Sequence, residues 1–275
     1  LNLNSPFMNK KILLAIFSAS ALFASVAHAD EVISPIPQIS NEWRFSVSPY
    51  GWLPQVNTTV SNGGAGSKNA DISMNNVLSN LKSGVMIAGE AHYGKWGVMA
   101  DFASATLQKS GGFNFKGDNT IYRAGDKSTL QATLFNLAGT YTVLSNQDAY
   151  VDALVGVRWI GLTTSFDVAL VADPSVRASA SSSTPATYGV VGVNSRYRIM
   201  GSNWYVPLYA DVGTGGGPNH QTWQASTGVG VALSKMVDVS LTYRAIGFDI
   251  KSGNNDSTLL KGLFHGPQIM GTFNF

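Results

Sequence analysis

Apolar and polar residues alternate along most of this chain, and this period of two constrains its fold more than any other feature. Trp43, Phe45 and Val47 share one phase, and the residues between them are polar. Similar alternation recurs at 84–94, 96–107, 129–143, 149–164, 188–199, 204–214, 221–233, 237–249 and 259–275. Successive side chains of a strand point to opposite faces, so the pattern predicts an all-β fold of about ten strands, with eight or twelve as alternatives.

The connections between these segments alternate in length. Short ones fall at 93–95, 144–148, 200–203 and 234–236, and longer ones fall at 57–83, 108–128, 165–187, 214–220 and 250–258. Short turns at one end and long loops at the other are typical of a transmembrane antiparallel up-and-down β-barrel, with the short turns on the periplasmic side. Beyond the N-terminal region no run of about 18 apolar residues predicts a membrane helix.

The charged residues of the strands fall on the phase opposite to the apolar one. Charge on a lipid-facing position costs about 2–4 kcal/mol for Arg or Lys at mid-depth, so these side chains are predicted to face the lumen. The candidate lumen charges are Arg44, Glu90, Asp101, Asp152, Arg158, Arg196, Asp211 and Arg244.

Aromatic residues distinguish a membrane barrel from a soluble sandwich, which would also place its charges on one face. Six of them lie on the apolar phase within a few residues of a short turn: Trp43, Tyr93, Trp96, Tyr141, Tyr197 and Trp204. A girdle of rings at one end of every hairpin is expected at a membrane interface.

The N-terminal region predicts export. Met8 is followed by Lys10 and Lys11, an apolar run over 12–26 and a small-x-small site ending at Ala29. We therefore expect residues 1–29 to comprise upstream residues and a cleaved secretory signal peptide, 30–41 a periplasmic N-terminal segment, and 42–275 the barrel. An N-terminal membrane helix is the alternative, but the apolar run is short and rich in serine.

Composition excludes several classes of protein. The chain has no cysteine, so no disulfide framework holds it together. Lys10 and Lys11 are the only basic residues upstream of Ala29; of the 18 basic residues 16 remain, against 16 acidic ones. A net charge of zero argues against nucleic acid as a partner. Charged residues make up only 12% of the chain, against about 25% in typical soluble domains.

Two motifs resemble those of a known family. "WRFSVSPYGWLP" at 43–54 is similar to a W-x-F-x-x-x-P-Y-x-W-x-P start, and "GPQIMGTFNF" at 266–275 to a G-P-x-x-G-x-x-F-x-F ending. Both resemble a largely uncharacterised family of proteobacterial outer-membrane β-barrel proteins. The resemblance implies location in the bacterial outer membrane, contact with its lipid and lipopolysaccharide, and recognition by the barrel-assembly machinery through the last strand, ending at Phe275. It implies no activity.

Candidates for catalysis are weak. His92, His220 and His265 are the histidines downstream of Ala29, and no nucleophile or metal-ligand spacing accompanies them. Glu90 and Asp101 are predicted to face inward near one level, where they could share a proton or be neutralised by Arg44. We expect no catalytic, cofactor or metal site.

The lumen charges predict two ion pairs. Asp152 and Arg196 are expected to meet near the periplasmic turns, and Asp211 and Arg244 at mid-depth, across a strand with small inward residues. Such pairs could fill a narrow lumen or line a small water path. Residues 71–84 could form a short helix with Ile72, Val77, Leu78 and Leu81 on one side, as a plug or a cap.

Prolines 49, 207 and 267 fall inside predicted strands, and we expect a bulge at Pro267 because it lies on the lipid-facing phase.

Three functions follow. The chain is expected to be an outer-membrane barrel with a structural or small porin-like transport role. A surface adhesion or binding protein acting through the loops 57–83, 108–128 and 165–187 is an alternative, and a hydrolase with its site at the rim is a third. The missing catalytic spacing disfavours the third.

Overall fold

We describe the fold from a computed structural model. The described residues are 33–62, 66–117, 120–171, 175, 177–215, 220–252 and 258–275. The predicted signal peptide and its cleavage site after Ala29 lie outside this range.

Strands dominate the described chain. They are β1 (Trp43–Trp52), β2 (Gln55–Asn62), β3 (Gly66–Ile72), β4 (Leu81–Tyr93), β5 (Trp96–Gly117), β6 (Thr120–Ser145), β7 (Ala149–Leu170), β8 (Arg177–Arg198), β9 (Trp204–Thr214), β10 (Gln221–Ala232), β11 (Val237–Ser252) and β12 (Thr258–Asn274), with helix α2 (Met74–Asn80) between β3 and β4.

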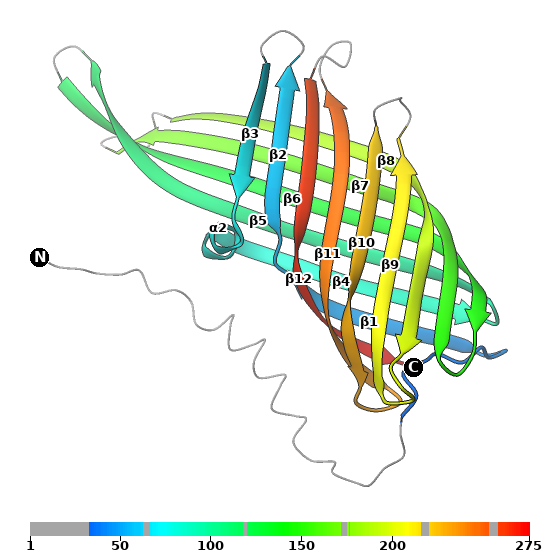
Figure 1. The fold of residues 1–275 in the computed structure, drawn as a ribbon. Coiled ribbons are helices and arrows are strands. Elements are labelled where there is room, and N and C mark those ends of the chain that lie inside the picture. The colour runs from blue at the N-terminus through cyan, green and yellow to red at the C-terminus, as the bar shows by residue number, and fades with distance from the viewer. Residues whose placement is uncertain are drawn as a thin grey trace, which may run out of the picture. The chain divides into compact units, whose positions relative to one another are not determined.

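Ten of these strands form a closed antiparallel barrel (Figure 1). The order is β1, then β4 to β12, and β12 pairs with β1 to close the sheet. At the closure Phe45 and Phe275 exchange two backbone hydrogen bonds, of 3.1 and 2.9 Å between N and O. The predicted barrel of about ten strands is confirmed. Closure gives hydrogen-bond partners to the backbone groups that an open edge would leave unpaired.

Alternation sorts the side chains as predicted. The six girdle aromatics are all exposed on the outer surface, from Tyr141 at 38% to Trp96 at 70%. Rings also contact one another across strands, as Trp96 does with Tyr141 at a centroid distance of 4.8 Å. At the opposite phase Asp101, Arg158 and Arg244 are buried in the interior.

The predicted outer loops are largely strand. β5 to β8 contain 22, 26, 22 and 22 residues, whereas β9 and β10 contain 11 and 12. The β5–β6 pairing continues to Gly117 and Thr120, and the β7–β8 pairing to Ala169 and Arg177. Much of 108–128 and 165–187 therefore extends the barrel wall. Apolar and polar residues alternate only weakly in these outer portions, because the strands there lie in water and polar residues suit both of their faces. The sequence pattern therefore did not indicate strands.

The described residues of the segment 57–83 also form strands and a helix. Its first part is the hairpin of β2 and β3, which continues the wall beyond β1 by pairing β2 with β12. Helix α2 follows, with the side chain of Ser73 accepting a hydrogen bond from the backbone N–H of Asn76 as N-cap. The predicted helix exists, but its predicted apolar side is only partly buried: Val77 is 5% exposed, whereas Leu78 is 54% exposed. Among the described residues no helix is long and apolar enough to cross a membrane.

The expected bulge at Pro267 is wrong. Pro267 pairs in unbroken register with Tyr243, and its carbonyl accepts a hydrogen bond from the backbone N–H of Leu53 at 3.0 Å. The side of Pro267 that lacks an N–H therefore faces Leu53 and Pro54, the two residues between the end of β1 and the start of β2. A break in the neighbouring strand accommodates the proline where a bulge was expected.

Close packing of strands makes Gly228 a sensitive position. A Cβ there would overlap the Leu241 carbonyl and the Thr242 Cα of β11, whereas a Cβ at Gly271 would meet no atom within 4 Å. We expect Gly228→Ala to lower the free energy of unfolding by about 1–3 kcal/mol, and Gly271→Ala to leave it unchanged. Urea midpoints of the two variants in lipid vesicles test this, and equal midpoints would contradict the close approach.

Candidate functional site

The lumen is the candidate site, and it has three layers along its length. A cavity of about 820 Å³, lined by charged, polar and apolar residues, lies toward the short turns and is called the turn-end cavity. A network of buried ion pairs, the central network, lies at mid-depth around Asp101, Arg158, Asp211 and Arg244. Beyond it, toward the long hairpins, lies an outer apolar layer of buried side chains that includes Trp52, Ile246 and Phe248.

Arg244 on β11 forms one half of the central network. Its guanidinium donates to Asp101 Oδ2 on β5 at 2.6 Å and to the hydroxyl of Tyr50 on β1 at 3.1 Å. That hydroxyl donates in turn to Asp101 Oδ1 at 2.5 Å. The guanidinium carbon also lies 5.1 Å from the ring centroid of Trp52. β11, β5 and β1 are thereby joined through one buried charge.

Arg158 on β7 forms the other half, and no part of its side chain is exposed. It forms an ion pair with Asp211 on β9. Its Nη1 donates to Thr222 Oγ1 at 3.0 Å, and its Nε donates to Asn136 Oδ1 at 2.8 Å. Nearly all its donors thus have acceptors, which is the condition under which a buried guanidinium is tolerated.

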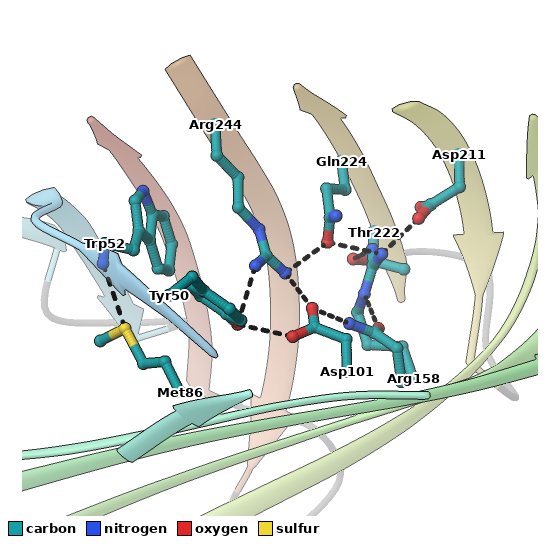
Figure 2. A network of polar contacts seen from close by, with 10 residues as sticks. Tyr50, Trp52, Met86, Asp101, Arg158, Asp211, Thr222, Gln224 and Arg244 are labelled. Atoms are coloured by element: carbon teal, nitrogen blue, oxygen red, sulfur yellow. Dashed lines mark hydrogen bonds and ion pairs between the residues drawn. The ribbon is translucent and has the colours of Figure 1, made fainter. Parts of the chain in front are cut away.

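Two uncharged residues join the halves into a ring. Gln224 Oε1 accepts from Arg158 at 3.0 Å and from Arg244 at 3.1 Å, and Asn136 donates to Asp101 Oδ2 at 3.2 Å. Figure 2 shows Arg244, Gln224 and Asp211 reaching from one wall toward Asp101 and Arg158 on the other. Asp211 is attached to this ring through Arg158, so the central network as a whole crosses the lumen with two positive and two negative charges.

The predicted pair of Asp211 and Arg244 is wrong in its partners. Asp211 pairs with Arg158, and Arg244 pairs with Asp101, although both belong to the central network. Alternation alone does not single out Tyr50, Asn136 and Gln224 as members of the network, because neutral polar residues on an inward phase carry no signal of their own. Their position near the level of inward charges on other strands is the signal that could have found them.

The predicted pair of Asp152 and Arg196 is also wrong. Arg196 pairs with Asp238 at 3.3 Å, stacks on the ring of Tyr205 with its guanidinium carbon 4.2 Å from the centroid, and donates to the Pro35 carbonyl at 3.1 Å. Tyr205 and Asn274 also donate to Asp238. The register between β7 and β8 explains the error. It pairs Arg196 with Tyr150 and Asp152 with Asn194, so Arg196 and Asp152 do not lie at the same level.

Asp152 lies fully buried near the turns, and among the described residues neither of its carboxylate oxygens has a hydrogen-bond partner. Its nearest basic group is His92, with 3.9 Å between Nε2 and Oδ2, and His92 in turn lies 3.3 Å from Glu90. Glu90 accepts from Asn194, and Arg44 donates to the Tyr150 hydroxyl at 3.5 Å. Glu90 and Asp101 therefore do not share a proton, and Arg44 is bonded to neither.

The N-terminal segment enters the turn-end cavity. Ser34, Pro35 and Ile36 line it, and Ile36 is 3% exposed. The contact of Arg196 with Pro35 holds this segment at the mouth. Residues 33–38 thereby narrow the end of the lumen that carries the short turns.

The outer apolar layer reflects a switch of phase within the strands. Val239, Leu241 and Tyr243 of β11 face outward, but Ile246 and Phe248, farther along the same strand, are 2% and 3% exposed in the interior. An apolar exterior suits lipid, and an apolar interior suits a barrel surrounded by water. The switch marks where β11 leaves the hydrocarbon, and it closes the outer half of the lumen with packed side chains.

The described histidines lack a catalytic arrangement with a carboxylate at the rim. His265 lies between the Tyr243 hydroxyl, at 2.5 Å, and Asn57 Oδ1, at 3.1 Å. Within the described ranges, no three residues of His, Asp or Glu are grouped as metal ligands.

The fold is similar to that of a solved outer-membrane barrel, and two further solved structures are matched with lower scores. The outer membrane protease OmpT from Escherichia coli is similar with a TM-score of 0.57 at 8% identity, over 88% of this chain and 100% of that one. The translocator domain of the autotransporter NalP from Neisseria meningitidis gives 0.38 at 11% identity, covering 97% and 98%. Ail, the attachment invasion locus protein of Yersinia pestis, gives 0.31 at 9% identity, covering 86% and 100%. No known protein family and no curated protein matches the sequence.

The closed sheet, the exterior girdle and this likeness of fold define the class. The chain is a transmembrane β-barrel protein of the bacterial outer membrane. At 8% identity the likeness to OmpT concerns the fold alone.

Arg158 is expected to be the most sensitive lumen residue. Arg158→Leu leaves the buried carboxylate of Asp211 without its cation and should lower the free energy of unfolding by about 3–5 kcal/mol. The exposed Arg177→Leu serves as control and should change it little. Urea unfolding of both variants, and of the double variant Arg158→Leu/Asp211→Leu, measures the effect. A double variant as unstable as the single one would contradict the assigned pair.

Arg196→Leu should be milder, at about 1–3 kcal/mol. Asp238 then keeps the donors Tyr205 and Asn274, and Arg196 is partly exposed. The same unfolding assay measures this loss. A loss as large as that of Arg158→Leu would mean that Arg196 neutralises a second buried charge, such as Asp152.

Proposed function

We propose that this protein is a closed, non-enzymatic outer-membrane barrel with a structural role, whose lumen does not conduct ions. The observation that carries the proposal is the ring of Arg244, Asp101, Asn136, Arg158 and Gln224 across the lumen. The porin-like alternative needs a continuous water path, and this ring interrupts one at mid-depth.

The outer apolar layer reinforces the closure. An ion that passed the central network would meet Trp52, Ile246 and Phe248, which offer it almost no polar groups. Removing one charge from the network therefore leaves a second barrier in place.

The outer surface and the last strand support the expected partners. The exposed girdle of rings and the apolar band suit outer-membrane lipid and lipopolysaccharide, and β12, with Phe273 and Phe275 exposed, suits recognition by the barrel-assembly machinery. We also propose membership of the proteobacterial barrel family that the motifs at 43–54 and 266–275 resemble.

Surface binding is a second candidate, favoured by the length of β5 to β8. These strands hold about twice the residues of β9 and β10, and a tilted strand needs only about 9–11 residues to cross a bilayer. The Ser-rich start of β8 at 177–183 is exposed. The β5–β6 and β7–β8 hairpins thus offer a large polar surface beyond the membrane.

The closed lumen predicts electrical silence. In planar bilayers, both the wild-type protein and Arg244→Ser should give no single-channel steps. A combined variant, Arg158→Ser/Arg244→Ser/Ile246→Ala/Phe248→Ala, truncates side chains in both the central network and the outer apolar layer. This variant should conduct, and its conductance would show that the assay detects barrels inserted in the bilayer. Steady channel steps from the wild-type protein would overturn the structural proposal and restore the porin-like one.

A further inference from the structure

A small apolar cavity lies within the outer apolar layer. Its volume is about 110 Å³, and its walls include Met86, Ala132, Leu134, Ile160 and Phe248. The function proposed above makes no use of this space. A cavity of this kind holds water poorly, because water needs several polar partners, whereas an apolar guest loses nothing on entering.

Trp52 carries a buried polar group beside the cavity. Trp52 is one of the lining residues, its Nε1 is buried, and this N–H has no hydrogen-bond acceptor within the described chain. Trp52 is held in place, since its backbone N–H lies 3.2 Å from the sulfur of Met86 and its ring packs beside Arg244 (Figure 2). A buried donor without an acceptor is costly, and a guest that offers an acceptor would relieve that cost.

Strand pairing in the barrel wall is interrupted beside the cavity. Pairing between β1 and β4 ends at Pro49 and Ile87, and beyond this level β1 and β2 follow β12 while β4 follows β5. The outer edge of β3 pairs with no strand among the described residues. Helix α2 contacts both β2 and β5, and its Val77 forms part of the cavity wall. One short helix, rather than a hydrogen-bonded strand, therefore stands over this gap in the strand pairing.

We infer that this cavity is a binding site for a small apolar molecule, about the size of one aromatic ring, that carries a single hydrogen-bond acceptor. The apolar walls bind its body, and Trp52 Nε1 donates to its acceptor. The gap at α2 is the route of entry, so binding requires no passage through the central network.

Binding of two fluorinated probes tests the site. 4-Fluorobenzonitrile carries an acceptor and fluorobenzene carries none, and both are titrated by ¹⁹F NMR against the full-length barrel in lipid nanodiscs. Empty nanodiscs give the linear partition into lipid. We expect saturable binding of both probes to the wild-type protein, with 4-fluorobenzonitrile bound at least threefold more tightly.

Matched variants locate the binding. Ala132→Leu adds three carbons to the cavity and should weaken binding at least tenfold, whereas Ala88→Leu adds the same carbons to the turn-end cavity and should leave it unchanged. Gly84→Val is a gentler filling variant, since a Cβ at Gly84 meets Ser104 O at 3.6 Å, an ordinary contact. It should weaken binding in the same direction.

The donor is tested separately by Trp52→Phe, which removes the indole N–H and should abolish the preference for 4-fluorobenzonitrile. An unchanged preference would overturn the role of Trp52. Linear partition alone, or equal loss in Ala132→Leu and Ala88→Leu, would overturn the site. These outcomes are independent of conductance, because a silent barrel can bind or fail to bind the probes.

Discussion

The structure depends on the closure of its sheet between β1 and β12. In lipid an unpaired backbone N–H or carbonyl finds no water to replace its partner, so a sheet that spans the membrane must close. The hydrogen bonds between Phe45 and Phe275, and the register from Ser46 paired with Asn274 to Trp52 paired with Gln268, make that closure here. With ten strands, closure also fixes a lumen narrow enough for side chains from opposite walls to meet.

A narrow lumen explains why the charges pair as they do. A buried charge is stabilised when it finds an opposite charge and further hydrogen bonds within reach, because desolvation outweighs a pair that is poorly satisfied. Arg158 meets this condition with Asp211, Asn136, Thr222 and Gln224. The network is therefore as much a consequence of closure as a candidate for function, and its neutrality keeps it stable without counterions.

Closure is incomplete in one place, and that place has distinct chemistry. Outward of Pro49 the wall between β1 and β4 opens, α2 covers the opening, and the space behind it is apolar. Beyond the membrane the surrounding solvent is water, so the apolar phase of β11 turns inward at Ile246 and builds a small core. The binding site that we infer lies where this core is not fully packed.

The fold class, the approximate number of barrel strands and the face on which the strand charges lie are predictable from the sequence. They follow from local alternation and from the cost of charge in lipid, which act on every strand alone. The hairpin of β2 and β3 and the outer portions of β5 to β8 were expected to be loops. Helix α2 was also predicted, because a helix over 71–84 places Ile72, Val77, Leu78 and Leu81 on one side.

Only the tertiary structure decided which charges meet, where Pro267 is accommodated and where the apolar cavity lies. Alternation indicates that Arg196 and Asp152 face inward, but it carries no information on the height or direction of either side chain. Strand tilt and register in the closed barrel set both, and they bring Arg196 to Asp238 and Asp101 to Arg244. The partners are non-local because the lumen is shared by all ten strands, whereas the pattern that reveals each strand is local.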